Sequence, residues 1–290
     1  MWLMLALGAA FFDSSADVIK KITLNRKTNE FVLLWLVFII SSLLLIPIAH
    51  FFPKGEKIDN EFFGLLALSG LLKFFSNIFY IKALKKSEIS LVLPIINFTP
   101  LFLLITSPLM LGEKYSWWGL FGVIIIVFGS YLLKIDSREK NWLAPIIALF
   151  SDRGVQLMLL VSLIWGIISN IDKMGVKASS SLTWVWAECI FMSIVFAPIA
   201  ISKLLKGKEQ IAKKDYIFLF FISLFSVLSG LSQMTALGYN KVPYVISAKR
   251  TNVIMSVLWG GWLFKEKDIG YKIIGSLIML IGVIIIVFAK

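Results

Sequence analysis

Long apolar segments separated by short polar connections run through the whole chain. Each holds about 20 residues, the length that an α-helix needs to cross the hydrocarbon core of a bilayer. Ten such segments cover residues 2–22, 31–51, 62–84, 89–111, 116–134, 154–175, 183–204, 216–238, 244–264 and 270–289. The pattern therefore predicts an all-α integral membrane protein with ten transmembrane helices.

The second half of the chain repeats the first at a constant shift of 153 residues. At this shift Lys20 aligns with Lys173, Glu113 with Glu266, and every apolar segment with another. The predicted organisation is a first five-helix repeat at 1–137, a linker at 138–153 and a second five-helix repeat at 154–290. Because five is an odd number, the second repeat enters the membrane inverted relative to the first. Inverted repeats are typical of secondary transporters, with the substrate in a central cavity between the halves.

Composition and charge agree with a membrane protein. Hydrophobic residues make up 59% of the chain, which excludes an ordinary soluble domain of this length. The net charge of +12 would suggest nucleic acid as the partner of a soluble protein, but most Lys and Arg lie in the loops, so membrane topology explains them and no nucleic acid partner is expected. The expected location is the plasma or inner membrane, and two fused repeats could form a complete pathway in a monomer.

Several local patterns occur in the same order in both halves. Trp165-Gly166 followed by Lys173 resembles the first-helix signature of the EamA-type repeat in the drug/metabolite transporter superfamily, and Phe12-Asp13 with Lys20 is a degraded version. The other matching patterns are Leu111-Gly112-Glu113, Phe264-Lys265-Glu266, Gly122 with Gly129, and Gly275 with Gly282. The resemblance implies transport, often export, of small polar or amphipathic metabolites from a central cavity.

The orientation in the membrane stays open. Lys and Arg are more frequent in the loops on the side opposite the termini, so the positive-inside rule places both termini outside the cytoplasm. The family resemblance implies the reverse orientation, with both termini in the cytoplasm.

A second resemblance concerns Lys249-Arg250 in the ninth segment. The pair is similar to the Lys-Arg pair that holds phosphate in organic-phosphate translocators of the same superfamily. Those proteins also carry a lysine at the position that Ile96 occupies here. The resemblance to a phosphate site is therefore half present.

Polar residues inside the apolar segments require an explanation, because a charge at mid-bilayer costs roughly 2.5–3.5 kcal/mol and usually faces a cavity or a partner. Four helices carry a polar stripe at spacings of i, i+4 and i+7, which share one helix face. The stripes are Asp13, Asp17 and Lys20; Gly166, Asn170 and Lys173; Lys73, Asn77 and Tyr80; and Ser226, Gly230 and Gln233. We expect these stripes to converge on the central cavity.

These considerations give two sets of candidate residues. The substrate-binding candidates are Lys73, Asn77, Tyr80, Asn97, Gln233, Lys249 and Arg250, and the coupling or gating candidates are Asp13, Asp17, Lys173 and Glu188. Depth in the membrane predicts that Glu188 pairs with Lys249 or Arg250 and that Asp13 pairs with Lys73.

Other intramembrane residues have structural interpretations. Lys20 and Lys173 are expected to snorkel or to cap helix ends, and Glu113 and Glu266 to stabilise the start of a following helix. Pro94, Pro100 and Pro108 are expected to kink the fourth helix, either to free carbonyl groups toward the cavity or as a purely structural kink. Gly122 with Gly129 and Gly275 with Gly282 predict close helix packing.

Three functional classes follow from these observations. The leading prediction is a secondary transporter, with export as the expected direction, for a small polar metabolite bearing a carboxylate or phosphate. The rival is proton-coupled efflux of cationic or hydrophobic compounds through Asp13 or Asp17. An intramembrane enzyme is a distant alternative, because the chain lacks an HExxH metal signature and a GxSxG elbow, and its single histidine is His50. No cofactor and no metal are expected.

Overall fold

The computed structural model describes residues 1–24, 29–51, 58–87, 92–134, 143–206, 215–255 and 269–289, and these residues form helices and connections without a strand. The helices are α1 (Trp2–Leu24), α2 (Glu30–Phe51), α3 (Phe62–Lys86), the 3-10 helix η1 (Leu93–Phe98), α5 (Thr99–Leu111), α6 (Trp117–Lys134), the short α7 (Ala144–Ile147) and η2 (Ala148–Phe150), α8 (Arg153–Ala178), α9 (Ser181–Leu205), α10 (Asp215–Tyr239), α11 (Val242–Lys249) and α13 (Ile269–Phe288). Each predicted apolar segment contains helix in its described part, and the all-α prediction is confirmed.

Six of the described helices are long and apolar enough to cross a membrane. They are α1, α2, α3, α8, α9 and α10. Shorter apolar helices cover Ile95–Leu111, Trp117–Leu132 and Ile274–Phe288. The end of the ninth predicted segment, 256–264, lies outside the described residues. A ten-span topology with inverted repeats therefore stays a prediction.

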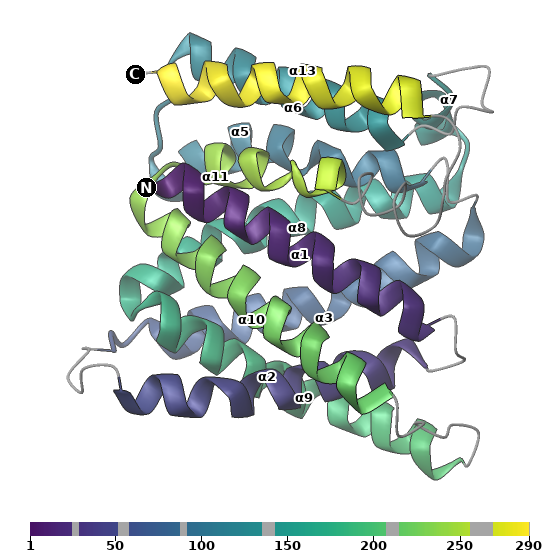
Figure 1. The fold of residues 1–290 in the computed structure, drawn as a ribbon, viewed down its shortest axis with the longest axis vertical. Helices are drawn as coiled ribbons and strands as arrows, with labels where there is room; N and C mark the ends of the chain where they lie inside the picture. Colours follow the sequence, from purple (N-terminus) through teal and green to yellow (C-terminus); the bar gives the residue numbers. More distant parts are fainter. Residues whose placement is uncertain are drawn as a thin grey trace.

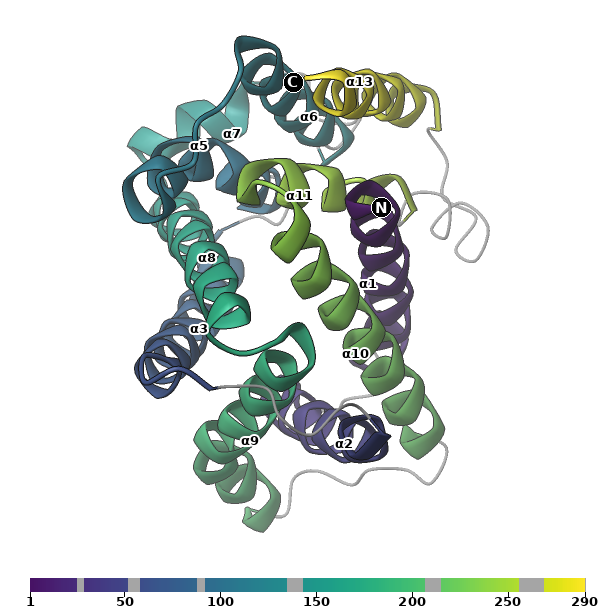
Figure 2. The same cartoon turned by 90° about the vertical axis from the view of Figure 1, so that its left-hand side faces the viewer.

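The helices pack in pairs that follow the sequence repeat. α1 packs on α10, α3 on α8, α2 on α9, and α6 on α13. At the repeat shift α1 corresponds to α8 and α3 to α10, so the pair α1–α10 is equivalent to the pair α8–α3. In the pairs α2–α9 and α6–α13, the two helices correspond to each other. Figures 1 and 2 show α6 and α13 at one end of the long axis, α2 and α9 at the other, and both termini on the same side.

Glycines set the crossing of α6 and α13, as the sequence predicted. A Cβ atom at Gly122 would lie 2.9 Å from the Gly282 carbonyl oxygen. A Cβ atom at Gly129 would lie 2.8 Å from the Gly275 carbonyl oxygen and 2.9 Å from the Met279 nitrogen. These neighbours are backbone atoms, which no side-chain rotation can move away. The two helices can approach this closely only because both surfaces lack side chains at the crossing.

Gly129→Ala is expected to lower the thermal unfolding temperature of the purified protein. Overpacking of this kind costs about 1–3 kcal/mol, more than the roughly 1 kcal/mol that alanine gains over glycine in helix propensity. Gly64→Ala in α3 is the matched control, because a Cβ atom there meets nothing within 4 Å. Thermal unfolding in detergent compares the two variants, and an unchanged or higher unfolding temperature for Gly129→Ala would contradict the close crossing.

The fourth and ninth predicted helices are irregular at repeat-equivalent positions. In the first half, the 3-10 helix η1 changes to α-helix at Thr99, and Pro100 lies in the first turn of α5. In the second half, α11 ends at Lys249, and the Arg250 N–H donates to the Ser247 oxygen at 3.0 Å, a 3-10-type bond. Residues 93–98 and 246–251 correspond at the repeat shift. Short 3-10 stretches inside longer helices often mark functional positions.

The carbonyl groups of Ile95 and Ile96 at this break accept hydrogen bonds inside the protein, which favours the purely structural kink among the two alternatives. Pro100 has no N–H for the Ile96 oxygen, and that oxygen instead accepts the N–H and the hydroxyl of Thr99. The Ile95 oxygen accepts the Ser162 hydroxyl of α8 at 2.9 Å. Buried backbone groups are costly when unpaired, so the break is stabilised by bonds inside the protein. The Pro94 side chain lies outside the described parts.

The second half begins at a well-defined helix cap. Asp152 accepts hydrogen bonds from the backbone N–H groups of Gly154, at 2.8 Å, and Val155, at 2.9 Å. The Ser87 hydroxyl, which follows α3, also donates to this carboxylate. The Ser87 hydroxyl and the two N–H groups hold the pKa of Asp152 below its usual value. The cap therefore fixes the start of α8 against the end of α3.

Candidate functional site

A cavity of about 360 Å³ lies between the two halves of the chain, within the size range of small-molecule sites. Its walls come from α1, α3 and the start of α5 in the first half and from α8, α10, α11 and the turn after α11 in the second. The lining residues are Asp13, Lys73, Ser76, Asn77, Thr99, Trp165, Ile168, Ser169, Asp172, Gln233, Met234, Ile246, Lys249, Arg250 and Asn252. Thr99 and Asn252, which correspond at the repeat shift, lie at the two helix irregularities, so these breaks form part of the wall.

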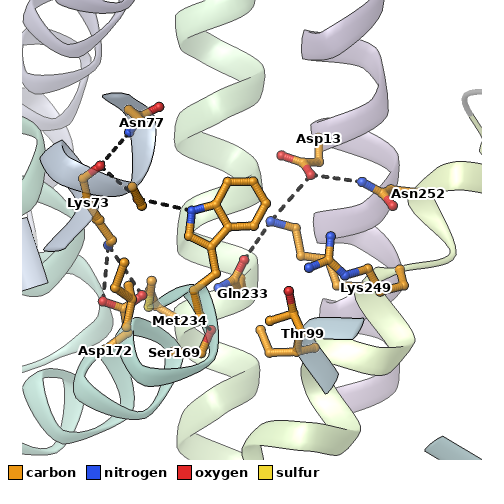
Figure 3. Close-up of a pocket in the computed structure, with 15 residues that line it drawn as sticks. Asp13, Lys73, Asn77, Thr99, Ser169, Asp172, Gln233, Met234, Lys249 and Asn252 are labelled. Atoms are coloured by element: carbon orange, nitrogen blue, oxygen red, sulfur yellow. Dashed lines mark hydrogen bonds and ion pairs between the residues drawn. The ribbon is translucent and has the colours of Figure 1, made fainter. Parts of the chain in front are cut away.

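One end of the cavity carries more cations than carboxylates, and we call it the cationic end (Asp13, Gln233, Lys249, Arg250 and Asn252; Figure 3). The Lys249 ammonium lies 3.5 Å from the Asp13 carboxylate and donates to the Gln233 side-chain oxygen at 2.6 Å. Asn252 donates to the same Asp13 oxygen at 3.1 Å. Among the described residues, the Nε atom of Arg250 is buried without a hydrogen-bond partner. The described charged groups at this end are therefore two cations and one carboxylate, and the carboxylate pairs with Lys249.

The other end has the opposite balance, and we call it the acidic cluster (Ser69, Lys73, Asp172, Trp184 and Glu188). The Lys73 ammonium lies 3.1 Å from Asp172 Oδ1 and also pairs with Glu188. The Trp184 ring N–H donates to Asp172 at 3.3 Å. The Asp172 side chain is 4% exposed and the Glu188 side chain 12%. Two buried carboxylates therefore share one cation.

An aromatic pair supports the wall between these two ends. The Trp165 ring N–H donates to the Ser76 hydroxyl at 3.2 Å, and the Tyr80 ring stacks on Trp165 with a centroid distance of 6.0 Å. Asn77 donates to the Lys73 backbone oxygen at 2.7 Å. Asn77 lines the cavity, whereas Tyr80 is absent from its lining and contacts Trp165 instead.

The predicted ion pairs are wrong, because the partners are exchanged. Glu188 was expected to pair with Lys249 or Arg250 and instead pairs with Lys73. Asp13 was expected to pair with Lys73 and instead pairs with Lys249. Depth in the membrane contains no information on which helix faces which neighbour, so it cannot identify the partner of a charged residue.

The polar stripe predicted on α8 faces a different neighbour. Gly166 lies against Thr99, Phe102 and Leu103 of α5, with ordinary van der Waals spacing for an added Cβ. Asn170 donates to the Thr106 hydroxyl and accepts from Ser107 at 2.6 Å, both also in α5. The residues of α8 that line the cavity are Trp165, Ile168, Ser169 and Asp172. The face of α8 that lines the cavity is therefore displaced by one residue from the predicted stripe.

Lys173 and Glu113 connect three helix ends rather than line the cavity. The buried Lys173 ammonium lies 2.7 Å from Glu113 Oε1 and donates to the Asn240 backbone oxygen at 2.7 Å. The Glu113 carboxylate accepts the N–H of Val242, the first residue of α11, at 3.0 Å. The predicted stabilisation of a helix start by Glu113 is thus observed, but the helix belongs to the other half. Glu266 and Lys267 lie outside the described residues.

Lys173→Met is expected to lower the thermal unfolding temperature, because it leaves the Glu113 carboxylate buried and the Asn240 oxygen without its donor. Removing one partner of a buried pair costs about 3–5 kcal/mol. Lys177→Met, on an exposed position of α8, is the matched control. If Lys173→Met and Lys177→Met unfold at the same temperature, the capping role is wrong.

The other predicted site residues lie in different surroundings. Asn97 is fully buried and donates to the Ser130 backbone oxygen at 2.9 Å, away from the cavity lining. Asp17 pairs with Lys20 at 3.1 Å, and its side chain is 54% exposed. Lys20 lines a second cavity, which lies beside Glu188 and Lys73. Gln233 and Arg250 line the first cavity as expected.

The sequence reading missed Asp172, which the structure places at the centre of the acidic cluster. The signal was available, because Asp172 is the one acidic residue inside the apolar segment 154–175. The same rule that drew attention to Asp13 and Lys73 applies to it. Asn252, Thr99 and Ser169 were also missed, and uncharged polar residues of this kind give no such signal.

The described residues contain no group of three or more His, Cys, Asp or Glu side chains that could hold a metal ion. Charged groups and amides line part of the cavity, together with apolar side chains such as Ile168, Met234 and Ile246.

Comparisons with known proteins agree with this architecture. An "Uncharacterized transporter" from Archaeoglobus fulgidus is 22% identical over 248 residues, which cover 85% of this chain and 83% of the relative. An "Uncharacterized transporter in cobO 3'region" from a Sinorhizobium species is 28% identical over 136 residues, 46% of this chain and 96% of the relative. A solved structure described only as "Crystal structure of protein" shares the fold, with a TM-score of 0.78, 14% identity and coverage of 98% of this chain and 95% of its own.

The comparison with protein families covers nearly the whole chain. The family described as "EamA-like transporter family" matches residues 1–135 and, again, residues 152–288. These two ranges correspond to the two halves that the sequence shift relates, and the named relatives are transporters. The apolar helices agree with insertion in a membrane. The chain therefore belongs to the EamA-like transporter family and is a multi-pass membrane transporter.

Proposed function

We propose that this protein is a secondary transporter for a small polar metabolite that carries a carboxylate or phosphate group, with export as its direction. The observation that carries the proposal is the cationic end of the cavity, where the described lining residues include two cations, Lys249 and Arg250, and one carboxylate, that of Asp13, which pairs with Lys249. A site with surplus positive charge in low-dielectric surroundings favours an anionic ligand.

The geometry of the cationic end supports an anion as the ligand. The Arg250 guanidinium has a buried Nε atom without a partner, and a guanidinium fork matches carboxylate and phosphate oxygens. Asn252 and Gln233 supply amide groups beside it. The Lys249 ammonium is 3.5 Å from Asp13, a longer contact than an ideal charged hydrogen bond. A substrate anion could replace Asp13 as the partner of Lys249 at small cost.

For the transport cycle we propose ten membrane spans arranged as two inverted repeats that expose the cavity alternately to each side. The repeat-related helix pairs and the paired irregularities at η1 and α11 support this arrangement, since broken helices at the repeat interface are typical of such sites. The Sinorhizobium relative is matched over nearly its whole length by about half of this chain, which supports duplication of a five-helix unit. The proposed location is the plasma or inner membrane.

The test is a thermal-shift screen of the purified protein against di- and monocarboxylates, organic phosphates and lipophilic cations. Binding to the folded state raises the unfolding temperature by mass action, so the screen needs no transport assay. Anions are expected to stabilise the protein, and competition by high salt should weaken the effect. Stabilisation by lipophilic cations alone would contradict the proposal.

The rival function is proton-coupled efflux of cationic or hydrophobic compounds, in which a carboxylate of α1 exchanges a proton for the substrate. Asp13 favours it, because it lines the cavity and lies in the middle of α1. Asp17 does not line this cavity and is paired with Lys20.

Asp13→Asn separates the two functions because they predict opposite changes. In an anion transporter the substitution frees Lys249 from its carboxylate, so anions should bind as well as before or more tightly. In a cation exporter it removes the acceptor, so stabilisation by cations should disappear. The same thermal-shift measurement on wild type and Asp13→Asn reports both outcomes.

A further inference from the structure

The acidic cluster forms the wall between two cavities. Asp172 lines the central cavity, Glu188 lines a second cavity of about 230 Å³, and Lys73 lines both. The second cavity extends from the cluster between α1, α2, α9 and α10. The two carboxylates that share Lys73 are therefore reached from different sides. This is the arrangement that a group needs if it must exchange a small ion with two compartments in turn.

The hydroxyl of Ser69 lies between the two carboxylates of the cluster. The Ser69 hydroxyl lies 3.0 Å from Asp172 Oδ1 and 3.1 Å from Glu188 Oε1. One hydroxyl hydrogen can be donated to only one of these oxygens. If Ser69 donates to Asp172, its contact with Glu188 is favourable only when Glu188 carries a proton and donates it to the Ser69 oxygen.

The partners of the two carboxylates differ in number. Asp172 accepts hydrogen bonds from the Trp184 ring N–H and the Ser69 hydroxyl. The Lys73 ammonium also donates to both Asp172 carboxylate oxygens, at 3.1 and 3.3 Å. Glu188 has Lys73 and Ser69 alone as its described partners. Hydrogen bonds to the charged form stabilise that form, so Glu188, which has fewer described donors, is assigned as the carboxylate that takes the proton.

We propose that Glu188, together with Asp172 and Lys73, is a proton-binding site that couples transport to a proton gradient; this inference rests on the proposed transport function. A proton from water in the second cavity binds a carboxylate oxygen of Glu188, and the cluster then holds one ammonium and one carboxylate. Its net charge changes from −1 to zero without any covalent change. When the protein opens to the other side, the proton is released to water there and the negative charge returns.

Within the part of the chain that the structure describes, few charged groups lie around Glu188. Lys73 comes from α3, Asp172 from α8 and Lys20 from α1, and the only cysteine of the chain, Cys189, is its neighbour in α9. The residues that α2 and α10 contribute to the second cavity are uncharged. The cationic end of the central cavity is separate from this cluster, so a proton and a substrate anion can bind at the same time.

The experiment is infrared difference spectroscopy of the full-length protein in liposomes during a change of pH, without any added solute. A protonated carboxylic acid gives a carbonyl band that moves when H₂O is replaced by D₂O. Exposed carboxylates also give bands when they are protonated, so Glu188 is identified by difference: the wild type is expected to show one band that Glu188→Gln lacks. Glu61→Gln, which removes an exposed carboxylate before α3, is the matched control and should retain the band.

Two further variants keep the test decisive. Ser69→Ala should shift the band, because it removes the hydroxyl that bonds the protonated Glu188. Asp172→Asn should weaken the band, because Lys73 then compensates the charge of Glu188 alone. A band that persists unchanged in Glu188→Gln, or no band in any wild-type sample, would overturn the proposal. Loss of stabilisation by amines in Glu188→Gln without any band would instead assign the cluster to a substrate's ammonium group. Anion binding is scored separately by thermal shift on wild type, so a failure here leaves the proposed function standing.

Discussion

Lys249→Ala combined with Arg250→Ala is expected to abolish the stabilisation of the protein by organic anions. The two side chains supply the surplus positive charge of the cavity, and Asp13 alone would remain at that end. A hydrogen bond to a charged group contributes about 1.5–3 kcal/mol, and each 1.4 kcal/mol is about tenfold in affinity. Loss of both cations should therefore weaken anion binding by at least about 100-fold.

The matched control removes the same two charge types from another place. Arg153 and Lys177 are exposed positions at the two ends of α8, outside the cavity lining. Arg153→Ala/Lys177→Ala should keep anion stabilisation at the wild-type level in the same thermal-shift assay. If both double variants respond to anions like wild type, Lys249 and Arg250 are not the anion site. If both lose the response, long-range charge rather than a local site is responsible.

Lys73→Met is expected to destabilise the fold strongly, and this expectation differs from the one that the sequence suggests. Seen from sequence, Lys73 is a substrate-binding cation whose neutralisation removes transport and leaves expression unchanged. In the structure it is the shared partner of Asp172 and Glu188, so its removal leaves two buried carboxylates side by side. Breaking a buried pair in this way costs about 3–5 kcal/mol, and the yield of folded protein should fall.

Charge restoration distinguishes this explanation from a simple loss of packing. The triple variant Lys73→Met/Asp172→Asn/Glu188→Gln carries no net charge in the cluster and should unfold near the wild-type temperature, since neutral replacements of buried ion groups are often tolerated. Lys86→Met, at an exposed position of the same helix, controls for loss of a lysine. A triple variant that is as unstable as Lys73→Met would show that packing of the lysine stem, not charge, is decisive.

Local sequence signals predicted the helices, the repeat and the glycine crossing of α6 on α13. The length of an apolar segment identifies a membrane helix, because unpaired backbone groups are not tolerated in hydrocarbon. A helix pairs its backbone groups within its own segment, so each segment can be recognised separately. The repeat needed only a comparison of the chain with itself. Glycines seven residues apart in both closing helices predicted a close approach because a missing side chain acts locally.

The partners of the charged residues were decided by the tertiary structure. Helical periodicity shows which residues share a face, but not which neighbour that face meets. On α8 a change of one residue turns the direction by about 100°, from the Asn170 face that meets α5 to the Ser169 face that meets the cavity. Lys73 could have met Asp13, yet α3 packs on α8, which brings Asp172 to it. The sequence thus determined the family, the elements and their duplication. The rotation and packing of the helices decided which charges pair and which face the cavity, because rotation and packing depend on contacts between residues far apart in the chain.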